Sequence, residues 1–156
     1  MKTKQLFLAL GTALALPALS LAKPVTLTTE LSAYSGDGAY VALYLTDANG
    51  QYKRTLWIAG KKPKYYKHLA DWARGSGQNK AEYDGMTGAS VHSGKTLSVT
   101  VEVPDALIDA GNQIHIDTAV EKKRDNRSEV VVPLTTDGAG KPTAGKGYVK
   151  AFTYSF

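Results

Sequence analysis

The segment from Asp84 to Ser90 has the residue types of a site for covalent modification. It reads Asp-Gly-Met-Thr-Gly-Ala-Ser, so the small residues Gly88 and Ala89 lie between the hydroxyl groups of Thr87 and Ser90. A hydroxyl oxygen can form a phosphoester, and small neighbours leave space for a second enzyme to approach it. We therefore predict a flexible, exposed loop whose Ser90 hydroxyl accepts a group. The alternative is an ordinary glycine-rich surface turn.

The first residues predict that the chain is exported. Lys2 and Lys4 precede an apolar run over residues 6–21, which ends in the small-x-small sequence Ser20-Leu21-Ala22. This order is typical of a secretory signal peptide with its cleavage site. We divide the chain into a signal peptide at 1–22 and a single domain at 23–156. The expected location is the periplasm, with no membrane span in the mature chain.

The composition argues against several kinds of site. The chain has no cysteine, which excludes disulfides, a lipid anchor on cysteine and thiolate metal sites. Without Lys2 and Lys4, the excess of basic over acidic side chains falls from five to three, which does not indicate a nucleic-acid surface. His68, His92 and His115 are far apart in the sequence, and we assign no metal site and no catalytic residue to them.

Alternating apolar and polar residues predict an all-β fold. Such segments are separated by Gly, Asn and Asp, and Asn49-Gly50 predicts a two-residue hairpin turn in which both residues have positive φ. Seven strands are expected at 25–34, 40–46, 51–59, 97–103, 113–122, 128–134 and 148–156. The first should bury Val25, Leu27, Thr29, Leu31 and Ala33, and the third should be buried on both faces. The expected architecture is an immunoglobulin-like β-sandwich of about seven strands with one short helix inserted.

The inserted helix is predicted over residues 64–74. Tyr65, Leu69 and Trp72 recur at helical spacing, with Pro63 before the segment and Gly75 after it. These aromatic side chains either fasten the helix to the sandwich or form an aromatic platform beside the acceptor segment. Lysine side chains in the same region would attract a phosphate group; they are Lys61, Lys62, Lys64 and Lys67.

The acceptor segment resembles a known modification motif. In bacterial flavoproteins modified by the FAD:protein FMN transferase, the acceptor hydroxyl ends a motif of the form Asp-x-x-Ser/Thr-Gly-Ala-Thr/Ser. The matching residues here are Asp84, Thr87, Gly88, Ala89 and Ser90. The resemblance implies covalent FMN on Ser90, which stands where Thr is usual.

A set of motifs in order also resembles an uncharacterised family of predicted periplasmic proteins. The set comprises Tyr40-Val41-Ala42, Asp47-Ala48-Asn49-Gly50, Arg54-Thr55-Leu56-Trp57, Lys64-Tyr65, Asp71-Trp72 and the acceptor motif. Members of this family resemble the immunoglobulin-like domain of the flagellar hook-cap protein, which again implies a β-sandwich. The resemblance further implies two partners, the FMN transferase and membrane proteins with PepSY domains, in extracytosolic redox or iron chemistry.

These observations favour an accessory or electron-carrier protein rather than an enzyme. In this hypothesis Ser90 carries FMN, Trp72 or Tyr83 stacks on the isoalloxazine ring, and Lys61, Lys62 and Lys64 screen the phosphate. A flavin-free binding module for a membrane partner is the alternative. A third possibility, a small outer-membrane barrel, rests on the alternation of Phe152, Tyr154 and Phe156 at the carboxyl end.

Overall fold

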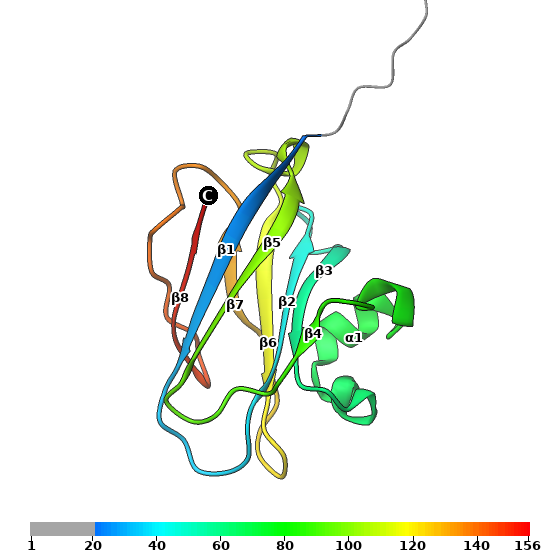
Figure 1. Cartoon of the computed structure of the whole chain (residues 1–156), viewed down its shortest axis with the longest axis vertical. Coiled ribbons are helices and arrows are strands. Elements are labelled where there is room, and N and C mark those ends of the chain that lie inside the picture. Colours follow the sequence, from blue (N-terminus) through cyan, green and yellow to red (C-terminus); the bar gives the residue numbers. More distant parts are fainter. Residues whose placement is uncertain (1–20) are drawn as a thin grey trace, which may run out of the picture.

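The computed structural model describes residues 21–156 as two β-sheets that face each other (Figure 1). The predicted signal peptide, apart from its last two residues, lies outside the described residues. The smaller sheet has the order β5-β1-β8, with the bounds Thr96–Pro104, Ala22–Leu31 and Val149–Ser155. The larger sheet has the order β4-β3-β2-β6-β7, with the bounds Thr87–Gly88, Tyr52–Ala59, Tyr40–Thr46, Gln113–Ala119 and Asn126–Pro133.

The predicted β-sandwich with a short helix is therefore confirmed. The described residues form eight strands rather than seven, because the two-residue strand β4 was not expected. It lies inside the acceptor motif and pairs in parallel with β3. Part of the expected loop is thus an edge strand.

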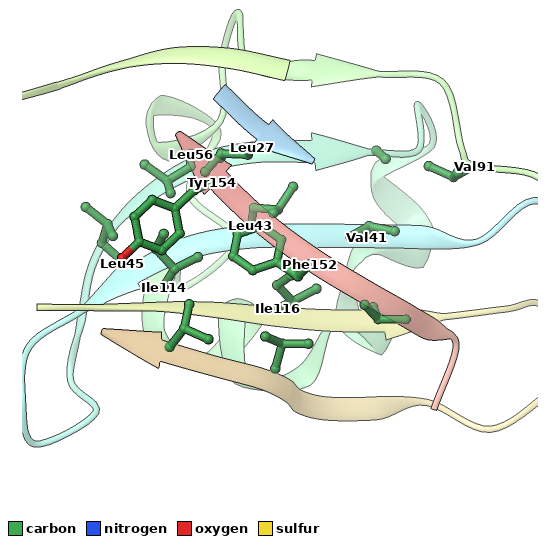
Figure 2. Packing of buried hydrophobic residues seen from close by; sticks show 14 of the residues in the cluster. Leu27, Val41, Leu43, Leu45, Leu56, Val91, Ile114, Ile116, Phe152 and Tyr154 are labelled. Atoms are coloured by element: carbon green, nitrogen blue, oxygen red, sulfur yellow. The ribbon is translucent and has the colours of Figure 1, made fainter. Parts of the chain in front are cut away.

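Alternating apolar side chains form the core between the sheets. Along β1, Val25, Leu27, Thr29 and Leu31 are buried as predicted, whereas Ala33 is exposed because the strand ends at Leu31. Figure 2 shows how the two inner faces meet. The side chains that pack there include Leu27, Phe152 and Tyr154 from the smaller sheet and Leu43, Ile114 and Ile116 from the larger one.

A second core covers the outer face of the larger sheet. There, Ala42, Tyr44 and Ile58 pack under a helical segment that lies away from β1 in Figure 1. Leu56 belongs instead to the core between the sheets, so β3 is buried on both faces as predicted. The pairing register of β3 with β2 shifts at Leu56. This irregularity places Leu56 and Ile58 on opposite faces of the sheet, although they are two residues apart.

The helical segment differs from its prediction. It consists of a 3-10 helix, η1, at Pro63–His68 and an α-helix, α1, at Ala70–Ser76, rather than one helix over 64–74. A 3-10 helix has three residues per turn, so Tyr66 enters the core one turn before Leu69. Of the two roles expected for Tyr65, packing in the core is wrong, because Tyr66 occupies that place and Tyr65 is only partly buried. Trp72 is fully buried.

The hairpin between β2 and β3 also differs in its turn. The Asp47 carboxylate accepts hydrogen bonds from the backbone N–H groups of Asn49 at 2.8 Å and Gln51 at 3.0 Å. Asp47 and Gln51 remain paired through the backbone, which leaves a three-residue loop. Gly50 has a φ of 78°, whereas the φ of Asn49 is negative. The prediction of a two-residue turn is therefore wrong, because Asp47 stabilises the longer loop.

The buried carboxylate of Asp117 ties the helical segment to the larger sheet. One of its oxygens accepts hydrogen bonds from the Tyr44 hydroxyl at 3.0 Å and the Ser128 N–H at 2.7 Å. The other accepts from the Trp72 N–H at 2.8 Å. Burial raises the pKa of Asp117, while these hydrogen bonds act in the opposite direction.

The buried carboxylate of Glu129 ties the two sheets together where their edge strands β7 and β8 lie. One oxygen accepts hydrogen bonds from the N–H groups of Gly147 at 2.7 Å and Val149 at 2.6 Å. The other accepts from the Thr118 hydroxyl. Glu129 therefore connects β6 and β7 with the start of β8.

Candidate functional site

Backbone hydrogen bonds hold the chain on both sides of Ser90. Before it, the N–H groups of Ile58 and Gly60 donate to the carbonyls of Met86 at 2.9 Å and Gly88 at 2.8 Å. After it, Val91 and Ala39 exchange two hydrogen bonds of 2.7 and 2.9 Å. The expected flexible loop is therefore wrong, because the motif is built into the edge of the larger sheet.

Gly88 is required for close packing rather than for flexibility. A Cβ atom on Gly88 would lie 2.8 Å from the Trp57 ring. This contact lets the motif run directly over the indole, and it fixes the backbone two residues before the acceptor. The indole N–H of Trp57 is buried and has no partner among the described residues.

A second glycine leaves the space that the acceptor side chain occupies. A Cβ atom on Gly38 would lie 2.5 Å from the Ser90 Oγ and 3.0 Å from its Cβ. The Ser90 hydroxyl forms no hydrogen bond with another described residue, and the side chain is partly exposed. The oxygen is thus seated against the loop before β2 and still reaches solvent.

Ser90 borders a cavity of about 550 Å³, here called the tyrosine cavity. Its walls come from the loop before β2, from η1 and from the hairpin between β6 and β7, which gather at the lower end of Figure 1. The side chains of Tyr40 and Tyr65 meet edge to face there, with ring centroids 5.7 Å apart. The lining residues are Asp37, Gly38, Tyr40, Lys62, Tyr65, His68, Ser90, Ala119, Val120, Glu121, Lys122, Lys123 and Asp125.

The polar lining of this cavity carries both signs of charge. Three lysines stand against three carboxylates, and His68 Nδ1 lies 2.9 Å from an Asp125 carboxylate oxygen. The Lys123 ammonium donates a hydrogen bond to the Ser35 hydroxyl at 2.9 Å, in the loop before β2. The cavity therefore offers hydrogen-bond donors and acceptors beside two aromatic rings.

Ser90 also borders a smaller hollow of about 290 Å³, here called the tryptophan groove. Its lining comes from β3, from the motif and from the start of β5. The lining residues are Trp57, Gly88, Ala89, Ser90, Val91, His92, Lys95, Thr96 and Leu97. Among the described residues, Ser90 is the one that lines both hollows.

The structure separates the predicted site residues into two groups. Asp84, Thr87 and Ala89 are exposed along the motif, next to Gly88 and Ser90. Trp72 is fully buried, so it presents no ring face to a ligand, and its predicted stacking role is corrected on that ground. Tyr83 is partly buried and packs edge to face on Tyr66 at 5.2 Å, outside both hollows.

The predicted lysines divide in the same way. Lys62 lines the tyrosine cavity, whereas Lys61 and Lys64 do not. The Lys64 ammonium lies 4.9 Å from the centroid of the Tyr65 ring. Sequence reasoning missed Gly38, Tyr40 and Lys123, which reach the site only through the fold. No local pattern marks them, although Tyr40 begins one of the quoted motifs.

Comparison with known families decides where this sandwich belongs. The model of the family described as "Predicted periplasmic protein (DUF2271)" matches residues 22–151. The chain belongs to the DUF2271 family. Membership places it in the periplasm, as the sequence predicted. No helix of the described part of this DUF2271 protein has the length and apolar character needed to cross a membrane. No curated protein and no solved structure matches the chain.

Proposed function

We propose that this DUF2271 protein is a periplasmic electron carrier with FMN attached covalently to Ser90. The observation that carries the proposal is the setting of the Ser90 hydroxyl. It has no hydrogen-bond partner among the described residues, it reaches solvent, and it stands at the rim of a cavity large enough for a cofactor. The motif Asp84-x-x-Thr87-Gly88-Ala89-Ser90 supplies the link to flavin.

The residues present fit the group. The space opposite Gly38 accommodates the acceptor oxygen, and a side chain at position 38 would fill it. Tyr40 and Tyr65 offer aromatic faces, while Lys62 and Lys123 offer cationic donors near a phosphate. When bound, the flavin would supply reversible uptake of electrons, and the protein would supply attachment, orientation and shielding from water.

FAD is the donor of the FMN group in the attachment step. The Ser90 oxygen bonds to the phosphorus on the FMN side of the FAD diphosphate, the phosphoanhydride bond breaks, and AMP leaves. The hydroxyl proton passes to a base of the FAD:protein FMN transferase. A membrane-bound redox protein of the PepSY class is the proposed partner of the attached flavin.

Intact mass of the protein made with the transferase in the periplasm tests this function. Wild-type protein is expected to gain the mass of one FMN less water, and Ser90→Ala is expected to gain none. Ser90→Thr is the matched control, because it keeps a hydroxyl at the acceptor position. Thr87→Ala removes the neighbouring hydroxyl and is expected to leave the mass gain in place. Unmodified wild-type protein beside an active transferase contradicts the proposal.

A flavin-free binding module is the remaining alternative. In that case the same hollows beside Ser90 would contact a membrane partner without a cofactor, and this protein, purified from the periplasm, would not absorb in the flavin range. The mass measurement and an absorption spectrum of the native protein separate the two functions.

A further inference from the structure

Ser90 borders two hollows, and an attached group can enter only one of them at a time. Apart from Ser90 they have different lining residues, and they differ in volume, aromatic content and polar groups. These differences indicate where the ring of the attached cofactor lies.

We infer that the tyrosine cavity holds the isoalloxazine ring of the FMN on Ser90, in contact with the rings of Tyr40 and Tyr65. This inference rests on the proposed function and adds the binding site of the ring to it. At about 550 Å³ the cavity has nearly twice the volume of the tryptophan groove at about 290 Å³. A tricyclic ring with its ribityl chain needs the larger space.

The aromatic side chains of the cavity are held in place before any ligand arrives. Gly60, with a φ of 120°, has no side chain, and a Cβ atom there would overlap the Tyr40 ring. The Tyr40 hydroxyl accepts a hydrogen bond from the Lys62 N–H at 3.2 Å. Tyr65 meets Tyr40 at an interplanar angle of 84°. Fixed rings lose little conformational freedom when a planar ligand stacks on them.

The polar groups of the cavity suit the heteroatoms of the ring. Its pyrimidine portion has carbonyl oxygens that accept hydrogen bonds and an N–H that donates one. Lys62, Lys122 and the His68–Asp125 pair offer both kinds of partner around one space. The tryptophan groove offers one aromatic residue and lacks a carboxylate among its lining residues.

Flavin fluorescence tests the position of the ring separately from attachment. Loading is measured first by intact mass. In loaded wild-type protein, stacking on tyrosine is expected to quench emission several-fold relative to the same protein unfolded in urea, and to protect the ring from iodide. Tyr65→Leu is expected to restore emission and iodide access at unchanged mass. Trp57→Phe, the matched change in the tryptophan groove, is expected to restore neither.

Two results with loaded protein overturn the inference and leave the proposed function standing. In one, Trp57→Phe restores emission and Tyr65→Leu does not, which assigns the ring to the tryptophan groove. In the other, folded and unfolded loaded proteins emit equally, which places the ring in solvent.

Failure of loading is a separate result that contradicts the proposed function. The cavity is then tested by titrating unmodified protein with riboflavin. Saturable quenching of riboflavin emission, with an affinity weakened about fivefold by Tyr65→Leu, supports a flavin-ring site. An absence of saturable quenching overturns it.

Discussion

The Ser90 hydroxyl fills the space that a side chain on Gly38 would take. Gly38 does not need a positive φ, so its role is close approach: a Cβ there would lie 2.5 Å from the Ser90 Oγ. The acceptor and its seat belong to different segments, one after β4 and the other just before β2. The site is therefore complete only when the larger sheet has formed.

Gly38→Ala is expected to destabilise the domain through this contact. Overpacking of this kind costs about 1–3 kcal/mol of unfolding free energy. Because the clash involves the Ser90 oxygen, Ser90→Ala in the same chain is expected to recover about 0.5–1 kcal/mol. Urea unfolding of the two single variants and the double variant measures this coupling. Strictly additive effects of the two substitutions would contradict a direct contact between position 38 and the Ser90 side chain.

Gly88→Ala is expected to disturb the packing of the motif on Trp57. The added methyl group would lie 2.8 Å from the indole ring, and the expected loss of unfolding free energy is about 1–3 kcal/mol. Trp57 emission should shift, since the indole must move. The matched control is Ala89→Ser at the exposed next position, with an expected change within about 0.5 kcal/mol. Equal stability of the two variants would show that Gly88 is not needed for packing.

Asp117→Asn is expected to change how stability depends on pH. Burial raises the pKa of Asp117 in the folded protein above its unfolded value of 3.8. The protonated carboxyl is therefore favoured by folding, and this contribution is complete below the unfolded pKa and lost as pH rises through the folded pKa. The amide side chain of the variant cannot titrate, and its NH₂ group must face a backbone donor, so the variant is less stable at every pH.

The difference in stability between wild type and this variant is thus expected to be largest in acid and to shrink as pH rises. Thermal unfolding of both proteins from acid to neutral pH measures it. An advantage that grows with pH would mean that the hydrogen bonds from Tyr44, Trp72 and Ser128 outweigh burial.

Glu129→Gln is expected to loosen the connection between the sheets. The carboxylate accepts hydrogen bonds from two N–H groups and one hydroxyl, and the amide nitrogen of the variant either faces an N–H donor or replaces the bond that the Thr118 hydroxyl donates. The expected cost is about 1.5–3 kcal/mol. Limited proteolysis should cut the segment 135–148 faster. Glu102→Gln, at an exposed position of β5, is the control and should change neither quantity.

The sequence predicted the strands well because their signal is local. Along β1 the alternation of Val25 and Leu27 with polar residues directly reflects which face is buried. The helical segment was predicted less well, since a 3-10 turn and an α-turn differ by a fraction of a residue per turn. That difference exchanged the roles of Tyr65 and Tyr66.

The candidate site could be predicted only in part, for a physical reason. The motif residues are consecutive, so their proximity is given by the chain. Gly38, Tyr40 and Lys123 reach Ser90 through strand pairing between distant segments. The choice of Trp72 as a stacking residue failed on burial, because an aromatic residue at helical spacing usually belongs to the core.

If Ser90 is modified as proposed, the backbone hydrogen bonds on either side of it also determine when a transferase can act on it. Before the domain folds, these hydrogen bonds are absent, and another protein can bind residues 84–90 along their backbone. After folding, the N–H groups of Ile58 and Gly60 and the Ala39–Val91 pair hold the same residues as a fixed surface. A transferase that binds an extended peptide must act before folding, and one that recognises the surface must act after it. The unfolded segment and the folded surface are therefore two different substrates, and folding of the exported chain replaces the first with the second.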